Sequence, residues 1–165
     1  MLAELIINQL KLQKHPEGGY FRETYRSEGE INFTECADFS GNRNYSTCIY
    51  FLLTSEQFSS FHRIKQDEIW HFYSGSAIRL FMISPQGDLT EHIIGNDLLQ
   101  GQNPQLVVPA NHWFAAEIIE PNSFALVGCT VAPGFDFSDF ELANRQELSI
   151  QFPQHQSLIE KLTRE

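Results

Sequence analysis

SFHRIKQDEIWHFYSG, residues 60–75, contains two runs rich in aromatic and β-branched residues with a short polar turn between them. Side chains alternate between the two faces of a strand, so His62 before the turn and Glu68 after it are expected to point inward together. A histidine and a carboxylate placed in this way form two corners of a metal site or an acid–base pair. The stretch therefore predicts two neighbouring strands that carry a candidate site.

The middle of the chain continues this strand pattern. Short runs of aromatic and β-branched residues are separated by Gly, Pro, Asn and Asp, which is typical of antiparallel strands joined by turns. The turns at Ser84–Asp88 and Glu120–Ser123 are expected to close two hairpins. Many short strands without intervening helices predict an all-β sandwich or barrel. The expected strands cover residues 19–26, 44–54, 58–64, 68–74, 76–84, 88–95, 105–109, 113–120 and 123–132.

Helices are predicted only near the two ends of the chain. Apolar residues recur at three- and four-residue spacing over residues 2–14, and the helical pattern returns around residues 138–150 and 153–162. We expect these helices to cover the outside of the barrel. The length of 165 residues is close to that of a typical domain, so residues 1–165 are expected to form one domain.

Composition narrows the partners and the compartment. The net charge of -10 and the scattered basic residues argue against nucleic acid as a partner. No apolar run approaches the ~20 residues that span a bilayer, so no membrane partner is expected. The three widely spaced cysteines Cys36, Cys48 and Cys129 form no Cys-x-x-Cys pair, are expected to be buried small hydrophobes, and indicate a reducing compartment. A cytoplasmic location is the natural expectation.

Two motifs resemble those of the cupin superfamily. His62, Glu68 and Gly75 match the spacing of the first cupin motif, with Ile64 in place of its second histidine. The stretch PANHWF, residues 109–114, is similar to the second motif, with Asn111 at the position of its glycine and Phe114 at that of its last histidine. Asparagine tolerates a left-handed turn better than other non-glycine residues, so the turn is expected to survive.

These replacements remove two of the ligands that the resemblance implies. A complete cupin site offers about three imidazoles and one carboxylate to a divalent metal. Here His62 and Glu68 remain, with His71 or His112 as possible recruits. We therefore expect no resident cofactor; if a divalent metal does bind, the expected ligands are His62, Glu68 and His112.

Further segments resemble one cupin family, Cupin_5 (DUF985), a domain of unknown function. They are HPEGGYFRETY at residues 15–25 and VAPGFDFSDFE at residues 131–141, together with shorter stretches at 61–63, 67–71, 108–110 and 113–116. The resemblance covers essentially the whole chain. It implies an all-β, double-stranded β-helix, the cupin or jelly-roll barrel, with a pocket inside. It also implies a homodimer and a small-molecule ligand as partners, without supplying a reaction.

Residues 18–24 are also similar to a stretch in the deoxysugar-nucleotide 3,5-epimerases, cupin-fold enzymes that need no metal. By this resemblance His62 is the counterpart of a general base that removes the proton next to a keto group. An unperturbed histidine pKa of ~6.5 suits such a step near neutral pH. The chain departs from the epimerases at Gly18 and Ser59, where those enzymes have arginines.

The candidate catalytic residues are thus His62 and Glu68. Flat aromatic faces suit a sugar ring or a nucleobase, and polar groups beside them fix its orientation. Residues 133–137 read as a turn whose aromatic residues either close the barrel mouth or seal its exterior against a partner subunit. The expected substrate-binding residues are Tyr20, Phe21, Glu23, Arg63, Trp70, His71, His112 and Trp113.

Three functions remain open at this point. The leading one is a small-molecule-binding cupin that isomerises or epimerises a sugar-like or nucleotide-like ligand without a metal. The second is a metal-dependent oxygenase or isomerase. The third is a non-catalytic binding module that works through its dimer surface.

Overall fold

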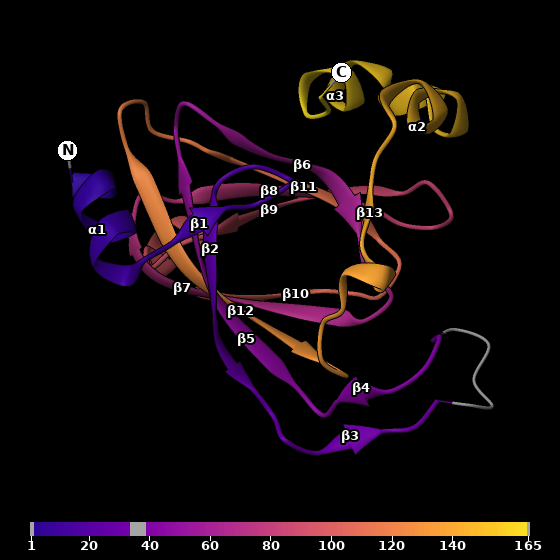
Figure 1. Ribbon diagram of the computed structural model, residues 1–165. Coiled ribbons are helices and arrows are strands. Elements are labelled where there is room, and N and C mark those ends of the chain that lie inside the picture. Colours follow the sequence, from indigo (N-terminus) through magenta and orange to yellow (C-terminus); the bar gives the residue numbers. More distant parts are fainter. Residues whose placement is uncertain (1, 34–38, 165) are drawn as a thin grey trace.

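The computed structural model describes residues 2–33 and 39–164, and two antiparallel β-sheets dominate it (Figure 1). The first sheet has the order β1-β2-β5-β12-β7-β10, and the second has the order β13-β6-β11-β8-β9. The two sheets face each other and close into a barrel, which confirms the predicted jelly-roll class. In chain order the first sheet comprises β1 (Gln13–Lys14), β2 (Tyr20–Arg26), β5 (Thr47–Thr54), β7 (Asp67–Gly75), β10 (Gln105–Val108) and β12 (Phe124–Ala132).

The second sheet is built from five strands, and a small additional sheet lies outside the barrel. In chain order the second sheet comprises β6 (Phe58–Arg63), β8 (Ile78–Ile83), β9 (Leu89–Ile94), β11 (Trp113–Ile118) and β13 (Glu141–Leu142). The additional pair is β3 (Glu30–Ile31) with β4 (Arg43–Asn44). The predicted strand over 44–54 is therefore divided, because a bend at residue 45 separates β4 from β5.

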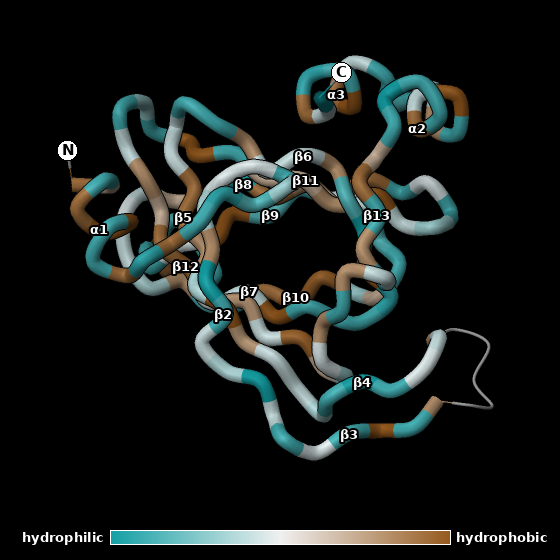
Figure 2. Tube along the Cα trace, in the orientation of Figure 1, coloured by the Kyte–Doolittle hydropathy of each residue, from teal (hydrophilic) through white to brown (hydrophobic). Residues whose placement is uncertain are grey.

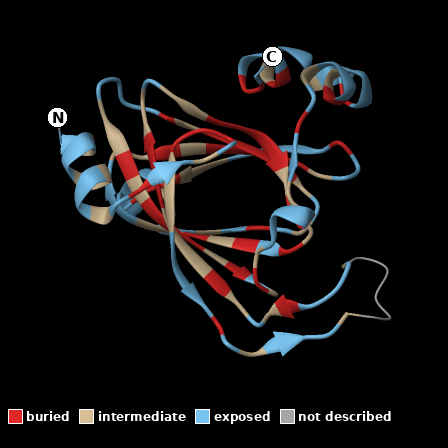
Figure 3. Ribbon diagram, viewed as in Figure 1, coloured by how far each residue is buried: buried red, intermediate tan, exposed pale blue. Residues whose placement is uncertain are grey.

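Strand alternation gives the barrel two hydrophobic clusters. One cluster, which includes Phe51, Trp70 and Phe114, lies between the two sheets. The other joins the outer face of the second sheet, including Phe61, to the C-terminal helices through Leu148. His62 follows Phe61 and therefore points to the opposite side, into the barrel. In Figure 3 the buried residues follow the barrel strands, whereas β3 is exposed.

The C-terminal helices pack outside the second sheet, as predicted, but they are shorter than expected. They are α2 (Arg145–Gln151) and α3 (Gln156–Lys161), and both carry hydrophobic and hydrophilic residues (Figure 2). The predicted helix over 138–150 was wrong in its first part, which contains the short 3-10 helix η2 (Phe137–Asp139) and β13. The Asn144 side chain accepts hydrogen bonds from the backbone N–H groups of residues 146 and 147, so it caps α2 and fixes its start.

The N-terminal helix α1 (Leu2–Leu10) ends earlier than the predicted residue 14. Lys11 has a φ of 54°, a left-handed conformation that no helix can continue, and the chain then enters β1. The remaining helical elements are the 3-10 turns η1 (Leu98–Gln100) and η3 (Pro153–His155). Within the described part of the chain, no helix is long and apolar enough to cross a membrane.

One of the two predicted hairpins is confirmed and the other is wrong. Ser84–Asp88 joins β8 to β9, and Ser84 N–H donates to the Asp88 carbonyl across 2.9 Å. Glu120–Ser123 instead joins β11 to β12, which lie in different sheets. Turn residues show where the chain reverses, but they do not show which strands then pair.

A buried ion pair fixes the segment that follows β12. Arg43 donates from Nε and Nη2 to the two carboxylate oxygens of Asp139, each across 2.7 Å, and both side chains are almost fully buried. Gln66 donates to the same carboxylate across 2.7 Å. Charge-assisted, two-pronged contacts of this kind are strong and directional. They hold residues 133–140 across one end of the barrel.

Candidate functional site

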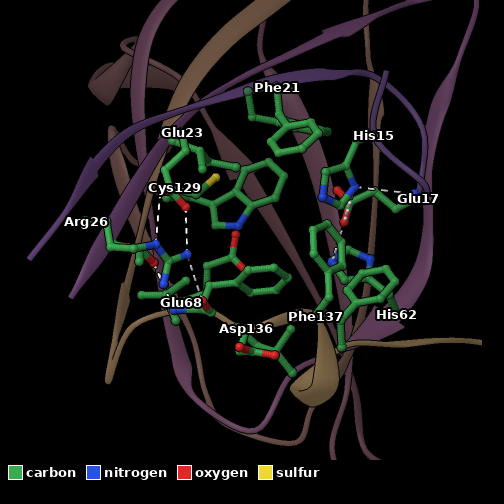
Figure 4. Close-up of a pocket in the computed structure, with 18 residues that line it drawn as sticks. His15, Glu17, Phe21, Glu23, Arg26, His62, Glu68, Cys129, Asp136 and Phe137 are labelled. Atoms are coloured by element: carbon green, nitrogen blue, oxygen red, sulfur yellow. Dashed lines mark hydrogen bonds and ion pairs between the residues drawn. The ribbon is translucent and has the colours of Figure 1, made fainter. Parts of the chain in front are cut away.

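A cavity of about 310 Å³ lies between the two sheets at the barrel end that residues 135–140 cross (Figure 4). Its walls come from β2, β5, β6, β7 and β12, from the loop at residues 15–17, and from residues 135–140. The volume matches the lower range of small-molecule pockets.

The His62 side chain enters this cavity from β6 and is held through both ring nitrogens. Nε2 lies 2.9 Å from Glu17 Oε2, and Nδ1 lies 2.7 Å from the Ser60 carbonyl oxygen. Burial alone would lower the pKa of His62. The contact with Glu17 outweighs this effect, together with smaller contributions from Glu68 and the Ser60 carbonyl, so the pKa of His62 is raised. His62 is thus held as an imidazolium with neither nitrogen free.

Glu17 is the centre of the polar cluster and was not predicted from the sequence. Besides His62, its carboxylate accepts a hydrogen bond from Ser59 Oγ across 2.9 Å and lies 3.3 Å from His15 Nδ1. Burial works to raise the pKa of Glu17, but the two histidines and the hydrogen bonds from His62 and Ser59 lower it below the usual value. Glu17 is therefore a fixed carboxylate between two imidazoles.

The loop at residues 15–19 is shaped to deliver Glu17 to this position. The Glu17 carbonyl accepts a hydrogen bond from Ser60 N–H across 2.8 Å, and Gly19 N–H donates to Gln57 Oε1 across 3.0 Å. Gly18 has a φ of 117°, and a Cβ there would collide with the Phe58 carbonyl. Only glycine fits such a position. Glu17 lies within residues 15–25, a segment that indicated the family in the sequence analysis. Its carboxylate was not identified there as a site residue.

Glu68 faces the same cavity from β7, in the opposite sheet, and behaves differently. Glu68 is only 9% exposed. Its pKa is raised to about 7, mainly because the carboxyl group is buried and, to a smaller extent, because the Glu17 carboxylate repels its charge. His62 and the neighbouring Cys129 and Trp70 groups offset this rise only in part. Trp70 Nε1 itself makes no hydrogen bond of good geometry. Glu68 is thus a carboxyl group that changes its protonation state near neutral pH.

The positions of the two missing cupin ligands are filled by apolar side chains. Ile64 is 3% exposed and lines the cavity, while Phe114 is fully buried with its ring centroid 4.0 Å from that of His62. The described residues contain no group of three or more His, Cys, Asp or Glu side chains placed to hold a metal ion. Because His62 has no free nitrogen either, these residues do not fit a metal centre of the cupin type.

His112 does not replace the missing ligand. It lies in the turn before β11, where its Nδ1 is 3.2 Å from the Ala110 carbonyl oxygen, and it is absent from the cavity wall. The neighbouring Asn111 has a φ of 61°, so the expected left-handed turn is present. Gly75, at the end of the first motif, has a φ of 102°, and a Cβ there would collide with the Phe124 carbonyl.

The structure brings three of the eight expected substrate-binding residues to the cavity. Phe21, Glu23 and Trp70 line it, and five do not: Tyr20, Arg63, His71, His112 and Trp113. Strand alternation explains two of these differences, because Tyr20 and His71 occupy positions next to inward-facing residues. Trp113 belongs to the outer cluster under the C-terminal helices, and Arg63 lies 4.5 Å above its ring.

Aromatic residues that follow Pro133 lie at the cavity mouth, which is one of the two roles considered for this segment. Phe135, Phe137 and Phe140 all line the cavity. The Phe137 ring stacks on the His15 ring with centroids 6.1 Å apart, and the Phe140 ring lies 5.4 Å from that of His62. Phe137 is nevertheless 52% exposed, so it stands between the cavity and solvent.

Arg26 connects β2 to this mouth. It donates to the two carboxylate oxygens of Glu23 across 3.0 and 2.7 Å, and to the Phe135 carbonyl across 3.1 Å. Its charge is therefore already neutralised. Among the cysteines, Cys129 is buried in the cavity wall as expected, Cys48 is half-buried, both are free, and Cys36 lies outside the described residues.

Comparison with known proteins agrees with this architecture. The model of the Cupin_5 family, described as Cupin superfamily (DUF985), matches residues 4–143. The chain belongs to the Cupin_5 family. The uncharacterized protein YML079W of Saccharomyces cerevisiae is 34% identical over 144 residues, which cover 81% of this chain and 71% of that protein.

Solved structures place this Cupin_5 chain among similar folds. Protein SO0799 from Shewanella oneidensis is 40% identical with a TM-score of 0.89, and the match covers 98% of this chain and 97% of that one. A hypothetical protein from Leishmania major is 32% identical with a TM-score of 0.90 and 99% coverage of both chains. Oxalate decarboxylase from Bacillus subtilis is 13% identical with a TM-score of 0.56, covering 90% of this chain and 36% of that one; this likeness concerns the fold alone.

Proposed function

We propose that this Cupin_5 protein binds a small, sugar-like carbonyl compound in the barrel and isomerises or epimerises it by proton transfer, without a metal. The observation that carries this proposal is Glu68, a buried carboxyl group with a pKa of about 7 that faces the cavity. A general acid or base works best when its pKa lies near the operating pH. Glu68 can therefore give or take a proton under ordinary conditions.

The composition of the cavity wall supports a ligand with flat, apolar faces and polar edges. Phe21, Phe51, Trp70 and Phe140 supply aromatic surface, while Glu68 supplies a polar group that can bond to a hydroxyl or carbonyl. Sugar rings bury well against aromatic faces and keep their hydroxyl groups for such contacts. Ile64 and Phe114 are apolar and stand where a cupin metal site has histidines, whereas Glu68 can change its protonation state. This combination favours proton transfer over metal chemistry.

The charges in the wall favour an uncharged sugar over a sugar nucleotide. The described cavity residues include two cationic groups, Arg26 and His62, and each is already bound to a carboxylate. A diphosphate would have to break one of these pairs and would also face the carboxylates of Glu17, Glu23 and Asp136. Desolvating an unpaired anion costs several kcal/mol in order of magnitude. We therefore expect neutral ketoses to bind better than nucleotide-linked sugars.

Two measurements test the proposed function. Thermal shift with the four D-ketohexoses should show a rise in Tm, since a ligand at 100 Kd stabilises by about 2.7 kcal/mol. Proton NMR in deuterium oxide should then show enzyme-dependent exchange of the C–H next to the ketone. Glu68→Gln should abolish the exchange for at least one of two ketoses that are epimers at that carbon, whereas Glu56→Gln, the same change in an exposed turn, should leave it intact for both. Absence of any shift and any exchange in the wild-type protein contradicts the proposal.

A further inference from the structure

His15 is a cavity residue that the sequence did not single out as a site. Its side chain is 8% exposed and lines the cavity, with Phe21, Phe51 and Phe140 packed around its ring. Burial, the largest effect, and the neighbouring His62 lower the pKa of His15, although Glu17 opposes them. The ring is therefore neutral near pH 7, in contrast to that of His62.

The contact with Glu17 selects which nitrogen of His15 carries the proton. Nδ1 lies 3.3 Å from Glu17 Oε2, and the Glu17 backbone N–H points at the same nitrogen across 3.4 Å. The neutral N–H favours a lone pair on Nδ1, but the full charge of the Glu17 carboxylate outweighs this long contact, so we assign the proton to Nδ1. The lone pair is then on Nε2, for which the described residues provide no hydrogen bond. Figure 4 shows this second nitrogen turned away from Glu17.

His15 and Glu68 reach the cavity from separate places in the fold. Glu68 is carried by β7 in the first sheet, whereas His15 is held by Glu17, which is bonded to Ser59 and His62 on β6 in the second sheet. In Figure 4 Glu68 is labelled at the left of the cavity, and the cluster of His15, Glu17 and His62 lies at the right. A ligand between them would contact one group on each side.

We propose that His15 Nε2 and the Glu68 carboxyl group are the two proton-transfer groups of this cavity, acting on opposite faces of one carbon, with Glu17 and His62 as positioning residues. This inference rests on the proposed function and names the groups that perform it. It moves the role of base from His62, whose nitrogens are both bound, to His15, which has one free.

The step balances without an oxidant or a cofactor. His15 Nε2 takes the proton from the carbon next to the carbonyl, and the C–H electron pair forms the C=C bond of an enolate. Glu68 then gives its carboxyl proton to the other face of that carbon, and the carbonyl re-forms. His15 ends with one additional proton and Glu68 ends as a carboxylate, and exchange with water restores both. The reverse direction starts from Glu68 as carboxylate and His15 as imidazolium.

The test uses stereochemistry, because a merely structural role would not produce a face-dependent result. The probes are D-fructose with its C3 epimer D-psicose, and D-tagatose with its C3 epimer D-sorbose, incubated in deuterium oxide and followed by NMR. We expect the wild-type protein to exchange the C3 proton of both members of a pair and to interconvert them. His15→Gln should exchange one member only, Glu68→Gln should exchange the other only, and both should lose interconversion by about 100-fold or more.

His62→Gln serves as the comparison for a positioning residue. It should slow exchange of both epimers by similar factors and keep their ratio. His15→Ala, which leaves space beside Glu17, should regain exchange when free imidazole is added, and this rescue separates loss of a base from loss of folding.

The inference fails if His15→Gln still interconverts the epimers, if it slows both equally, or if imidazole rescues nothing. If Glu68→Gln abolishes exchange while His15→Gln changes nothing, the proposed function stands and only the role of His15 is overturned. If the wild-type protein exchanges none of the four sugars, the proposed function itself is contradicted.

Discussion

His62 Nε2 lies 2.9 Å from Glu17 Oε2, and both residues are at least 95% buried. Two charges removed from water in this way stabilise each other only as long as both are present. The pair joins the loop before β2 to the second sheet, and therefore holds one wall of the cavity in place. The stability of the fold and the geometry of the site depend on the same contact.

Removing one partner of this pair should destabilise the protein strongly. Glu17→Gln leaves the His62 imidazolium buried without its counter-ion, and we expect it to lower the free energy of unfolding by about 3–5 kcal/mol. Glu23→Gln, which breaks the exposed pair with Arg26, should cost about 0–1 kcal/mol. Urea unfolding of both variants checks this. Equal decreases in the free energy of unfolding would show that the buried pair stabilises the protein no more than the exposed pair does.

The pH dependence of the same pair has a definite sign. The lowered pKa of Glu17 stabilises the fold above about pH 4.5, and this contribution is lost as the pH falls through the folded-state value. The raised pKa of His62 stabilises the fold below about pH 6.5, and this contribution is lost as the pH rises through its folded-state value. The stability that Glu17→Gln removes should therefore be largest between about pH 4.5 and 6.5. A loss that grows steadily up to pH 9 would contradict this assignment.

Glu68 should act on stability in the opposite sense. A pKa raised from 4.5 to about 7 means that the folded state holds the proton more tightly, so stability is greatest below pH 4.5 and falls as the pH rises to about 7. The fall amounts to about 3 kcal/mol. Glu68→Gln should remove it, so the variant gains on the wild type between pH 5 and pH 8. The stability of Glu56→Gln should follow that of the wild type at every pH. If stability varied with pH in the same way in all three proteins, the raised pKa of Glu68 would be contradicted.

Metal should be unnecessary for the fold and for ligand binding. Ile64 in the cavity wall and the buried Phe114 stand where a cupin metal would need imidazoles, and His62 is bound through both nitrogens. We expect protein purified without chelators to contain no stoichiometric manganese, iron, nickel or zinc, and added metal to leave Tm unchanged. Elemental analysis and a thermal shift series decide the point. Stoichiometric metal whose loss follows His62→Gln would overturn it.

Phe137 should matter more for the ligand than for folding. Its ring is 52% exposed and stacks on His15 at the cavity mouth. Phe137→Ala should therefore cost at most about 1 kcal/mol of stability, while weakening ketose binding in a thermal shift titration. Ile150→Ala, a truncation of an 80% exposed residue on α2, is the matched control and should leave binding unchanged. Unaltered binding in Phe137→Ala would show that Phe137 does not contact the ligand at the cavity mouth.

The barrel could be predicted from the sequence because strand alternation and turn residues are local signals. The same alternation places His62 and Glu68 inside, and in the structure both line one cavity, from opposite sheets. Glu17 and His15 could not be found in this way, because they lie in a loop whose path depends on hydrogen bonds to Ser60 on β6 and to Gln57 in the connection before it. Loop geometry is set by such distant partners, which no periodicity records.

Two wrong assignments have different origins. His71 was expected in the pocket as a possible recruit for a missing ligand, yet neighbouring strand residues face opposite sides, and His71 Nε2 lies 3.1 Å from Thr130 Oγ1 instead. The turn at residues 120–123 was predicted correctly as a turn, but its connection to another sheet depends on which strands had already paired. The position of His71 follows from alternation alone, whereas the connection made by residues 120–123 needs the three-dimensional arrangement.

The protonation of Glu68 can be measured directly, by following its carboxyl carbon in a ¹³C NMR pH titration and assigning the signal through its loss in Glu68→Gln. We expect a midpoint of about 7, as burial and Glu17 require. A midpoint near 4.5 would show an ordinary, solvated carboxylate, and Glu68 could then not serve as the proton-transfer group of this cavity.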